Sequence, residues 1–336
     1  MKNAGKIILK TAFGLTAATA VFGITYNEIV LTRKSKKVIE IADKINAKKA
    51  QQNTEEKPEQ EPKKIREDVF CTDNSGEWYD KQEKEHTVIT NFADKRIHAF
   101  IVRAKKPSSK WAIITHGYSS APGGMSEQAM YYGEHGYNLL LPALRGHGVS
   151  EEKYISMGWY DRLDMLDWIS YILSLDKDAE IVLHGVSMGA GTAMLTTGEA
   201  LPENVKCCIA DCGYTTLWEE YESEFKTHYH IPTFPLLYSA NLATKLICGF
   251  SYKEVSCVEQ LKKSKTPTLF IHGEKDTFVP YWMSEKNYCC CSAEKELLPI
   301  PDAQHAESCR VHPEIYWSRL QEFLNKYISE KQVVKV

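Results

Sequence analysis

The feature that most constrains the fold of this chain is a regular alternation of short apolar runs with helical patterns, between about residues 86 and 327. A continuous apolar run bounded by glycine or proline is typical of a strand that is buried on both faces, as in a parallel sheet. The sequence therefore predicts an α/β fold, in which a mostly parallel central sheet has helices on both faces. The runs that carry this prediction are WAIITH (111–116), YNLLLP (137–142), EIVLHG (180–185), VKCCIAD (205–211), PTLFIHG (267–273) and ELLPI (296–300).

One interval, residues 212–266, breaks the alternation because it contains helical patterns and no clear strand. An insertion that follows a parallel strand lies over the crevice where such folds bind ligands, so we predict a helical cap at about 212–266. The aromatic side chains of this interval fit two interpretations, an apolar pocket for an acyl or aryl group, or packing of the cap on the core. They are Trp218, Tyr221, Phe225, Tyr229, Phe234 and Tyr238.

The N-terminal segment, residues 1–32, predicts a membrane anchor or a signal segment. Its stretch IILKTAFGLTAATAVFGITYNEIVL carries only Lys10 and Glu28 as charges and is long enough for a short transmembrane helix. We interpret it as an uncleaved signal-anchor. A secretory peptide cleaved near Ala18-Thr19-Ala20 is one alternative and a peripheral helix is another. Basic residues flank both ends of the stretch, so the positive-inside rule does not decide the side of the membrane.

Residues 33–68 are rich in Lys, Glu, Gln and Pro and have hardly an aromatic side chain. Such a segment cannot bury enough apolar surface to offset its ordering entropy, so we predict a charged flexible linker. The remaining chain, residues 69–336, is long enough and apolar enough to form the α/β domain with its cap.

Charge and cysteine usage exclude several classes of function. The formal net charge is −3, and no basic stripe interleaved with aromatics appears after the first seventy residues, so we do not expect nucleic-acid binding. The ten cysteines lack the CxxC pairs of a zinc site and the spacing of a disulfide scaffold. Consecutive positions such as Cys289–Cys291 face three directions on a helix, so they do not jointly ligate a metal.

A candidate nucleophile lies in EIVLHGVSMGAGTAML (180–195), which combines a strand-like run, a G-x-S-x-G motif and a helical pattern. This order predicts a sharp turn that exposes Ser187 at the carboxyl edge of the sheet and at a helix N-terminus. The helix dipole and free N–H groups there favour the negative charge of an oxyanion. His184 precedes the turn on the strand, and we interpret it as a packed residue.

A serine is a poor nucleophile on its own and needs a base and an orienting acid. Asp276 and His305 each follow a strand-like run, and the chain order Ser187, Asp276, His305 suits this kind of fold. We therefore predict that these three residues form a catalytic triad. Asp211 is an alternative acid, and His147 is an alternative base.

The oxyanion of an acyl-transfer reaction needs two backbone donors. The segment His116-Gly117-Tyr118 follows the strand-like run at 111–116. We predict that the N–H groups of Tyr118 and Met188 form the oxyanion hole.

The motifs THGYSS, LRGHGVS, GVSMGAG, HGEKDTFVP and QHAES together resemble those of the α/β-hydrolase fold serine hydrolases, near the branch of serine aminopeptidases and monoacylglycerol lipases. The resemblance covers about residues 86 to 330, and membrane-proximal bacterial hydrolases of unknown activity look most similar. It implies that the loop from Arg145 to Ser150 supports the site without reacting. Relatives carry an Asp two residues before this Arg, whereas this chain has Ala143, which puts a local Asp–Arg support of the loop in doubt.

The expected activity is two-step acyl transfer with an acyl-enzyme intermediate and without a metal or organic cofactor. An esterase for short or medium acyl or aryl esters is the first interpretation. A peptidase or aminopeptidase of the same fold is the second, and a non-catalytic binding scaffold is the third. The expected partners are a small ester or peptide substrate and a membrane, the latter through the N-terminal segment. The sequence predicts no particular oligomeric state.

Overall fold

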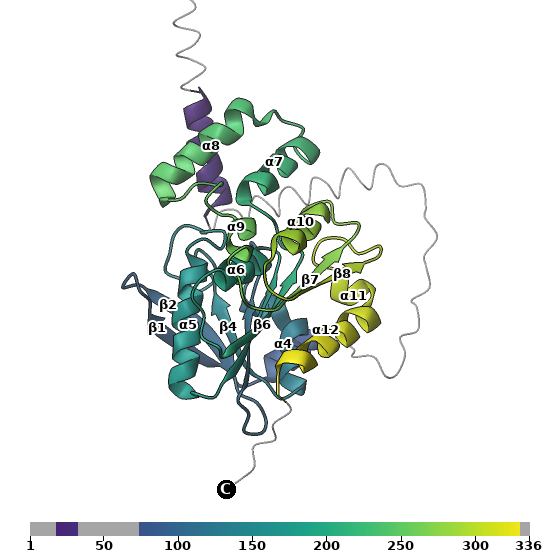
Figure 1. Ribbon diagram of the computed structural model, residues 1–336. Helices are drawn as coiled ribbons and strands as arrows, with labels where there is room; N and C mark the ends of the chain where they lie inside the picture. The colour runs from purple at the N-terminus through teal and green to yellow at the C-terminus, as the bar shows by residue number, and fades with distance from the viewer. Residues whose placement is uncertain (1–17, 33–73, 330–336) are drawn as a thin grey trace, which may run out of the picture.

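A computed structural model describes residues 18–32 and 74–329 of the chain. Its centre is an eight-stranded sheet in the order β1-β2-β4-β3-β5-β6-β7-β8 (Figure 1). The first two pairings in this order are antiparallel and all the others are parallel. The strands are β1 (Glu85–Thr90), β2 (Arg96–Val102), β3 (Lys110–Thr115), β4 (Asn138–Ala143), β5 (Glu180–Val186), β6 (Val205–Asp211), β7 (Thr268–Gly273) and β8 (Lys295–Ile300).

The sheet separates two hydrophobic cores, because successive side chains of a strand point to opposite faces. On β5, Ile181 and Leu183 belong to one core and Val182 to the other. Helices α5, α6 and α10 pack on the first face, and α4 and α12 pack on the second. Within residues 74–329 and outside the cap, the helices are α3 (Ser75–Lys81), η1 (Pro122–Met125), α4 (Ser126–Glu134), α5 (Asp161–Leu175), α6 (Met188–Thr197), α10 (Trp282–Cys290), α11 (Ser308–Val311) and α12 (Pro313–Tyr327). The helix α3 was not predicted.

Between β6 and β7 the chain forms three helices, α7 (Leu217–Thr227), α8 (Thr233–Cys248) and α9 (Cys257–Leu261). The helices α7 and α8 lie above the sheet, whereas α9 packs on α6 (Figure 1). Thr216 is the N-cap residue of α7, and its hydroxyl accepts a hydrogen bond from the N–H of Glu219 (3.0 Å).

A helix at residues 18–30 lies beside α8 (Figure 1), although the two helices are far apart in the sequence. The two helices approach closely at Gly23, where a Cβ atom would lie 2.5 Å from the carbonyl oxygen of Ser239. The strand bridge between Thr32 and Tyr154 then joins the end of this segment to the main domain.

Among the described residues, none of the helices combines the length and the apolar character that a membrane span requires. The rest of the predicted anchor, residues 1–17, and the predicted linker at 33–68 lie outside the described residues. Both interpretations therefore stay predictions.

Candidate active site

Ser187 occupies the turn between β5 and α6 in a backbone conformation that is rare for a side-chain-bearing residue, with φ 58° and ψ −120°. The turn is tight on both sides of the serine. A Cβ atom at Gly185 would lie 2.1 Å from the carbonyl oxygen of Gly189, and one at Gly189 would lie 2.0 Å from that of Thr115. Only glycine fits these two positions, and the tight turn presents the Ser187 hydroxyl at the edge of the sheet.

The structure brings Ser187 together with two residues from distant loops. Nε2 of His305 lies 2.8 Å from Oγ of Ser187, and Nδ1 of His305 lies 2.7 Å from Oδ2 of Asp276. Asp276 follows β7, and His305 lies between β8 and α11. A proton on Nδ1 held by the carboxylate leaves Nε2 free to accept the serine proton, which is the arrangement that general-base catalysis requires.

Asp276 is buried, and the hydrogen-bond donors that surround its carboxylate favour the ionised form. Its Oδ1 accepts hydrogen bonds from the N–H groups of Phe278 (3.0 Å) and Val279 (2.9 Å). Its Oδ2 also lies 3.2 Å from Nε2 of His272. Burial opposes ionisation, but the hydrogen bonds from His272 and His305 outweigh it and hold the pKa of Asp276 below its usual value. The carboxylate is therefore charged at neutral pH.

Asp211, the alternative acid, is buried at the end of β6 and has a different partner. Its Oδ2 accepts a hydrogen bond from the hydroxyl of Tyr316 (3.0 Å), and its Oδ1 has no hydrogen-bond partner. Burial raises the pKa of Asp211 to about 6. The same Tyr316 hydroxyl lies 3.4 Å from His184, which is fully buried. Asp276, and not Asp211, therefore contacts His305. His184 is packed in the interior.

The loop that follows β3 lies against Ser187. A Cβ atom at Gly117 would come within 3.4 Å of Cβ of Ser187, so the loop and the nucleophile are in close contact. Met188 is the first residue of α6, and the first N–H groups of a helix have no partner within the helix. The backbone amides of Tyr118 and Met188 therefore come from the two segments that border the Ser187 hydroxyl.

Two histidines hold this loop in place. Nε2 of His116 accepts the N–H of Leu144 (3.2 Å), and Nε2 of His147 accepts the N–H of Ser119 (3.1 Å). Burial lowers the pKa of His116 to about 3, so its imidazole is neutral. His147 is the alternative base. Its Nε2 is already occupied by the hydrogen bond from Ser119, whereas a general base needs this nitrogen to accept a proton.

Arg145 is supported from a helix instead of by a neighbouring Asp in its own loop. Its guanidinium donates to both carboxylate oxygens of Asp164 on α5, at 2.6 and 2.7 Å. Asp161 accepts the N–H of Arg145 (2.8 Å). The loop therefore has an ion pair although position 143 is alanine, because Asp164 of α5 supplies the acid for Arg145.

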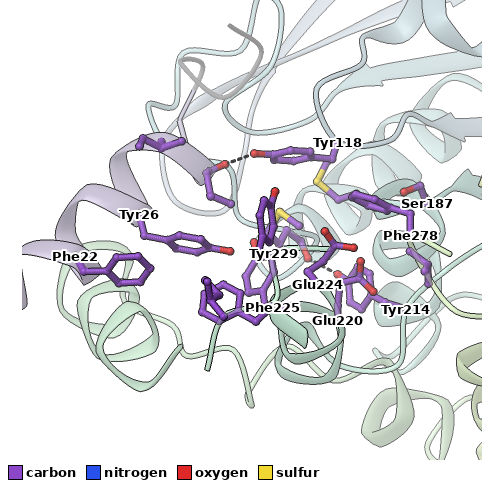
Figure 2. A pocket seen from close by; sticks show the side chains of 17 residues that line it. Phe22, Tyr26, Tyr118, Ser187, Tyr214, Glu220, Glu224, Phe225, Tyr229 and Phe278 are labelled. Atoms are coloured by element: carbon purple, nitrogen blue, oxygen red, sulfur yellow. Dashed lines mark hydrogen bonds between the residues drawn. The ribbon is translucent and has the colours of Figure 1, made fainter. Parts of the chain in front are cut away.

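A cavity of about 340 Å³ opens next to Ser187 and extends between α7 and the helix at residues 18–30 (Figure 2). Aromatic and aliphatic side chains form most of its wall, which makes it suited to an apolar group. The lining residues are Phe22, Tyr26, Ile29, Val30, Tyr118, Met157, Ser187, Met188, Tyr214, Glu220, Tyr221, Glu224, Phe225, Tyr229, Ile231, Phe278 and Val279.

Two acids from α7, Glu220 and Glu224, face this apolar cavity and are only 4% and 7% exposed. Oε2 of Glu220 and Oε1 of Glu224 have no hydrogen-bond partner, although the latter lies 3.5 Å from Nε2 of His228. Burial raises the pKa of Glu220 well above its usual value and that of Glu224 to about 7. Burial thus favours the protonated, neutral form of both carboxyl groups, and Glu224 titrates close to neutral pH.

Sequence reasoning missed these acids, the contribution of residues 18–30 and the contact of His272 with Asp276. The spacing of Glu220 and Glu224 places them on one face of a helix, which was a usable signal. However, acidic residues on a helix usually face water, so the pattern alone did not indicate a pocket.

Within the described residues, one group has the ligand atoms for a metal ion, namely Cys212, Asp276 and His305. Asp276 and His305 already bond to each other, and burial raises the pKa of the Cys212 thiol well above its usual value. A protonated thiol is a poor ligand, so this group suits proton transfer better than metal binding.

Comparisons with known proteins identify the family and the fold. Residues 113–229 match the family described as "alpha/beta hydrolase fold", and residues 243–305 match the family described as "Serine hydrolase". The uncharacterised protein YqkD of Bacillus subtilis is 29% identical over 269 residues, which cover 78% of this chain and 88% of that protein.

Solved structures are similar to the whole fold. The esterase Pf2001 of Pyrococcus furiosus has a TM-score of 0.61 at 22% identity, covering 77% of this chain and 96% of that one. An acylaminoacyl peptidase of Pyrococcus horikoshii has a TM-score of 0.56 at 20% identity, covering 79% of this chain and 45% of that one. The predicted α/β-hydrolase fold is thereby confirmed.

Proposed function

Because this chain is a serine hydrolase of the α/β-hydrolase fold, we propose that it cleaves carboxylic esters with short or medium acyl groups or aryl groups. The observation that carries this proposal is the continuous contact from Asp276 through His305 to Ser187, at the mouth of an apolar cavity. The cavity accommodates an uncharged acyl or aryl group, whose burial contributes about 0.8 kcal/mol for each methylene.

In the proposed reaction, Oγ of Ser187 attacks the ester carbonyl while Nε2 of His305 takes the hydroxyl proton. The resulting oxyanion accepts hydrogen bonds from the amides of Tyr118 and Met188. His305 then returns the proton to the departing alcohol, which leaves the acyl group on Ser187. A water molecule, deprotonated by the same nitrogen, releases the acid and restores the serine. Asp276 keeps the imidazole in the required tautomer throughout.

A peptidase that takes substrates with a free ammonium group is the second candidate. Glu220 and Glu224 favour it, because each has a buried carboxyl oxygen without a hydrogen bond, which is suited to a buried cation. The wall of aromatic and aliphatic side chains favours a neutral acyl group, and burial disfavours the charged form of Glu220, so we place the esterase first.

We also propose that the N-terminal segment associates with a membrane. The exposed side of α8 supports this proposal, since Tyr238, Leu242 and Leu246 recur every fourth residue and are all exposed. The chain before residue 18 adds apolar residues interspersed with lysines, which is a composition that anionic lipid attracts. Flotation of the full chain with vesicles that contain anionic lipid tests this proposal, and a chain that stays in the dense fraction contradicts it.

The activity is tested with a fluorophosphonate probe and two substrate panels. We expect the full chain to be labelled at Ser187 and to hydrolyse p-nitrophenyl acyl esters faster than aminoacyl p-nitroanilides. Ser187→Ala should abolish labelling and hydrolysis, whereas Ser170→Ala, on the exposed side of α5, should leave both unchanged. Hydrolysis that survives Ser187→Ala would refute the proposal, and faster cleavage of the anilides would favour the peptidase.

A further inference from the structure

We propose that residues 18–32 are a specificity element of the hydrolase, in which Tyr26 and Phe22 close the end of the acyl cavity and set the length of the acyl group. The inference rests on the proposed function, because it concerns the same cavity. It assigns a role in the active site to a segment that its apolar sequence alone predicts to be a membrane anchor.

The docking of this segment is specific, because polar contacts fix its register on α8. Asn27 is buried, its Nδ2 donates to the carbonyl of Ala240 (3.3 Å), and its Oδ1 accepts the hydroxyl of Thr244 (2.9 Å). A buried amide is costly unless it is hydrogen-bonded, so these two bonds favour one position of the helix. The backbone contact at Gly23 requires the same position.

The inner face of the helix forms part of the cavity wall. The ring of Tyr26 packs edge-on against those of Phe225 (centroids 5.5 Å apart) and Tyr221 (6.0 Å) of α7. Phe22 also packs against Phe225 (6.5 Å). In the view of Figure 2, Tyr26 and Phe22 lie on the side of the cavity opposite Ser187. An acyl group bound to Ser187 therefore extends towards these two rings.

The same segment also contacts the loop that borders the nucleophile. The carbonyl of Val30 accepts a hydrogen bond from the hydroxyl of Tyr118 (2.5 Å). The carbonyl of Leu31 accepts the N–H of Ile155 (2.9 Å). The segment thus connects the end of the cavity to the residue whose amide is a proposed oxyanion donor.

The docked position and a membrane-spanning position compete for the same residues. A span over 7–31 would withdraw Tyr26 and Asn27 from the cap and remove one wall of the cavity. The active form of the hydrolase therefore keeps residues 18–32 on the cap, and attachment to a membrane falls to the residues before them.

The test measures kcat/KM of the full chain for p-nitrophenyl esters from two to twelve carbons. We expect Tyr26→Ala to move the optimum to longer acyl groups, with a gain of about fourfold for each additional methylene that the enlarged cavity buries. Tyr26→Trp should move the optimum to shorter groups. The matched control is Val21→Ala on the outer side of the same helix, at a residue 64% exposed, and it should leave the profile unchanged.

A second pair of variants tests the docking itself. Gly23→Ala introduces a Cβ 2.5 Å from a backbone oxygen of α8 and should flatten the chain-length profile, whereas Gly76→Ala meets no atom within 4 Å and should not. Fluorophosphonate titration of Ser187 shows which variants retain a functional nucleophile. An unchanged profile in Tyr26→Ala and Gly23→Ala, with full labelling, would overturn the inference and leave the proposed function intact. Loss of labelling in the unmodified chain would instead refute the proposed function.

Discussion

His272 and His305 contact the same oxygen of Asp276, with Nε2 of His272 3.2 Å and Nδ1 of His305 2.7 Å from Oδ2. This nitrogen also lies 2.8 Å from the carbonyl of Val279, which only accepts, so Nε2 carries the proton. The Nε2 proton is thus shared between the carbonyl of Val279 and the carboxylate of Asp276, and His272 positions this carboxylate.

We expect His272→Leu to lower kcat about tenfold, because Asp276 loses a donor and part of its orientation. His272→Gln, which retains a side-chain N–H, should recover much of that loss. A purely structural role would lower the melting temperature in both variants without this difference in kcat, so kcat and thermal unfolding are measured together. Equal kcat values in the two variants would contradict the positioning role.

The assignment of the acid is tested by comparing Asp276→Asn with Asp211→Asn. An amide at position 276 favours the wrong tautomer of His305, and the expected loss in kcat is about 10⁴-fold. Asp211 bonds to Tyr316 instead, so its amide should cost far less in kcat. Steady-state kinetics on one p-nitrophenyl ester decide between them, and a larger loss from Asp211→Asn would transfer the role of the acid.

The sheet and the three proposed catalytic residues were predictable because their signals are local. Each of the strands β3 to β8 contains a short apolar run, and Ser187, Asp276 and His305 each follow one. The sharp turn at Ser187 also requires glycines at positions 185 and 189, and these are visible in the sequence. Short-range patterns therefore contained the fold and the position of the candidate site.

The rest depends on contacts between distant parts of the chain. Asn27 finds its partner 213 residues away, at Ala240, and nothing near Asn27 in sequence distinguishes a docked helix from a membrane helix. Arg145 pairs with Asp164 on the next helix, although the family pattern directed attention to position 143. Whether a side chain such as Glu220 faces a cavity or water is likewise decided by tertiary packing.

The pH dependence of substrate binding should follow Glu224. Burial, together with the charge of Asp276, raises its pKa from 4.5 to about 7, while His228 acts in the opposite direction. As pH rises through 7, a negative charge develops in the cavity, so KM for neutral esters should increase several-fold. Glu224→Gln should remove this increase, and a KM that rises equally in the variant would exclude Glu224 as its source.

The same pKa shift affects stability. The folded chain binds the Glu224 proton more tightly than the unfolded chain does, so stability declines as pH rises from about 4.5 to 7 and stays lower above that range. We therefore expect Glu224→Gln to raise the melting temperature at pH 8 relative to the unmodified chain, and to change it little at pH 4. A gain of equal size at both values of pH would contradict this explanation.

A substitution of His147 distinguishes support of the loop from base catalysis. Its Nε2 accepts the N–H of Ser119, next to the residue whose amide is a proposed oxyanion donor. His147→Leu removes the acceptor and loosens the loop, so we expect kcat to fall by about 10- to 100-fold with little change in KM. Removal of a whole oxyanion donor lowers kcat by about 100- to 1,000-fold, and a loosened loop should lower it less. Fluorophosphonate labelling of Ser187 should persist, because His305 still activates the hydroxyl. A loss of labelling as complete as in His305→Ala would instead make His147 the base.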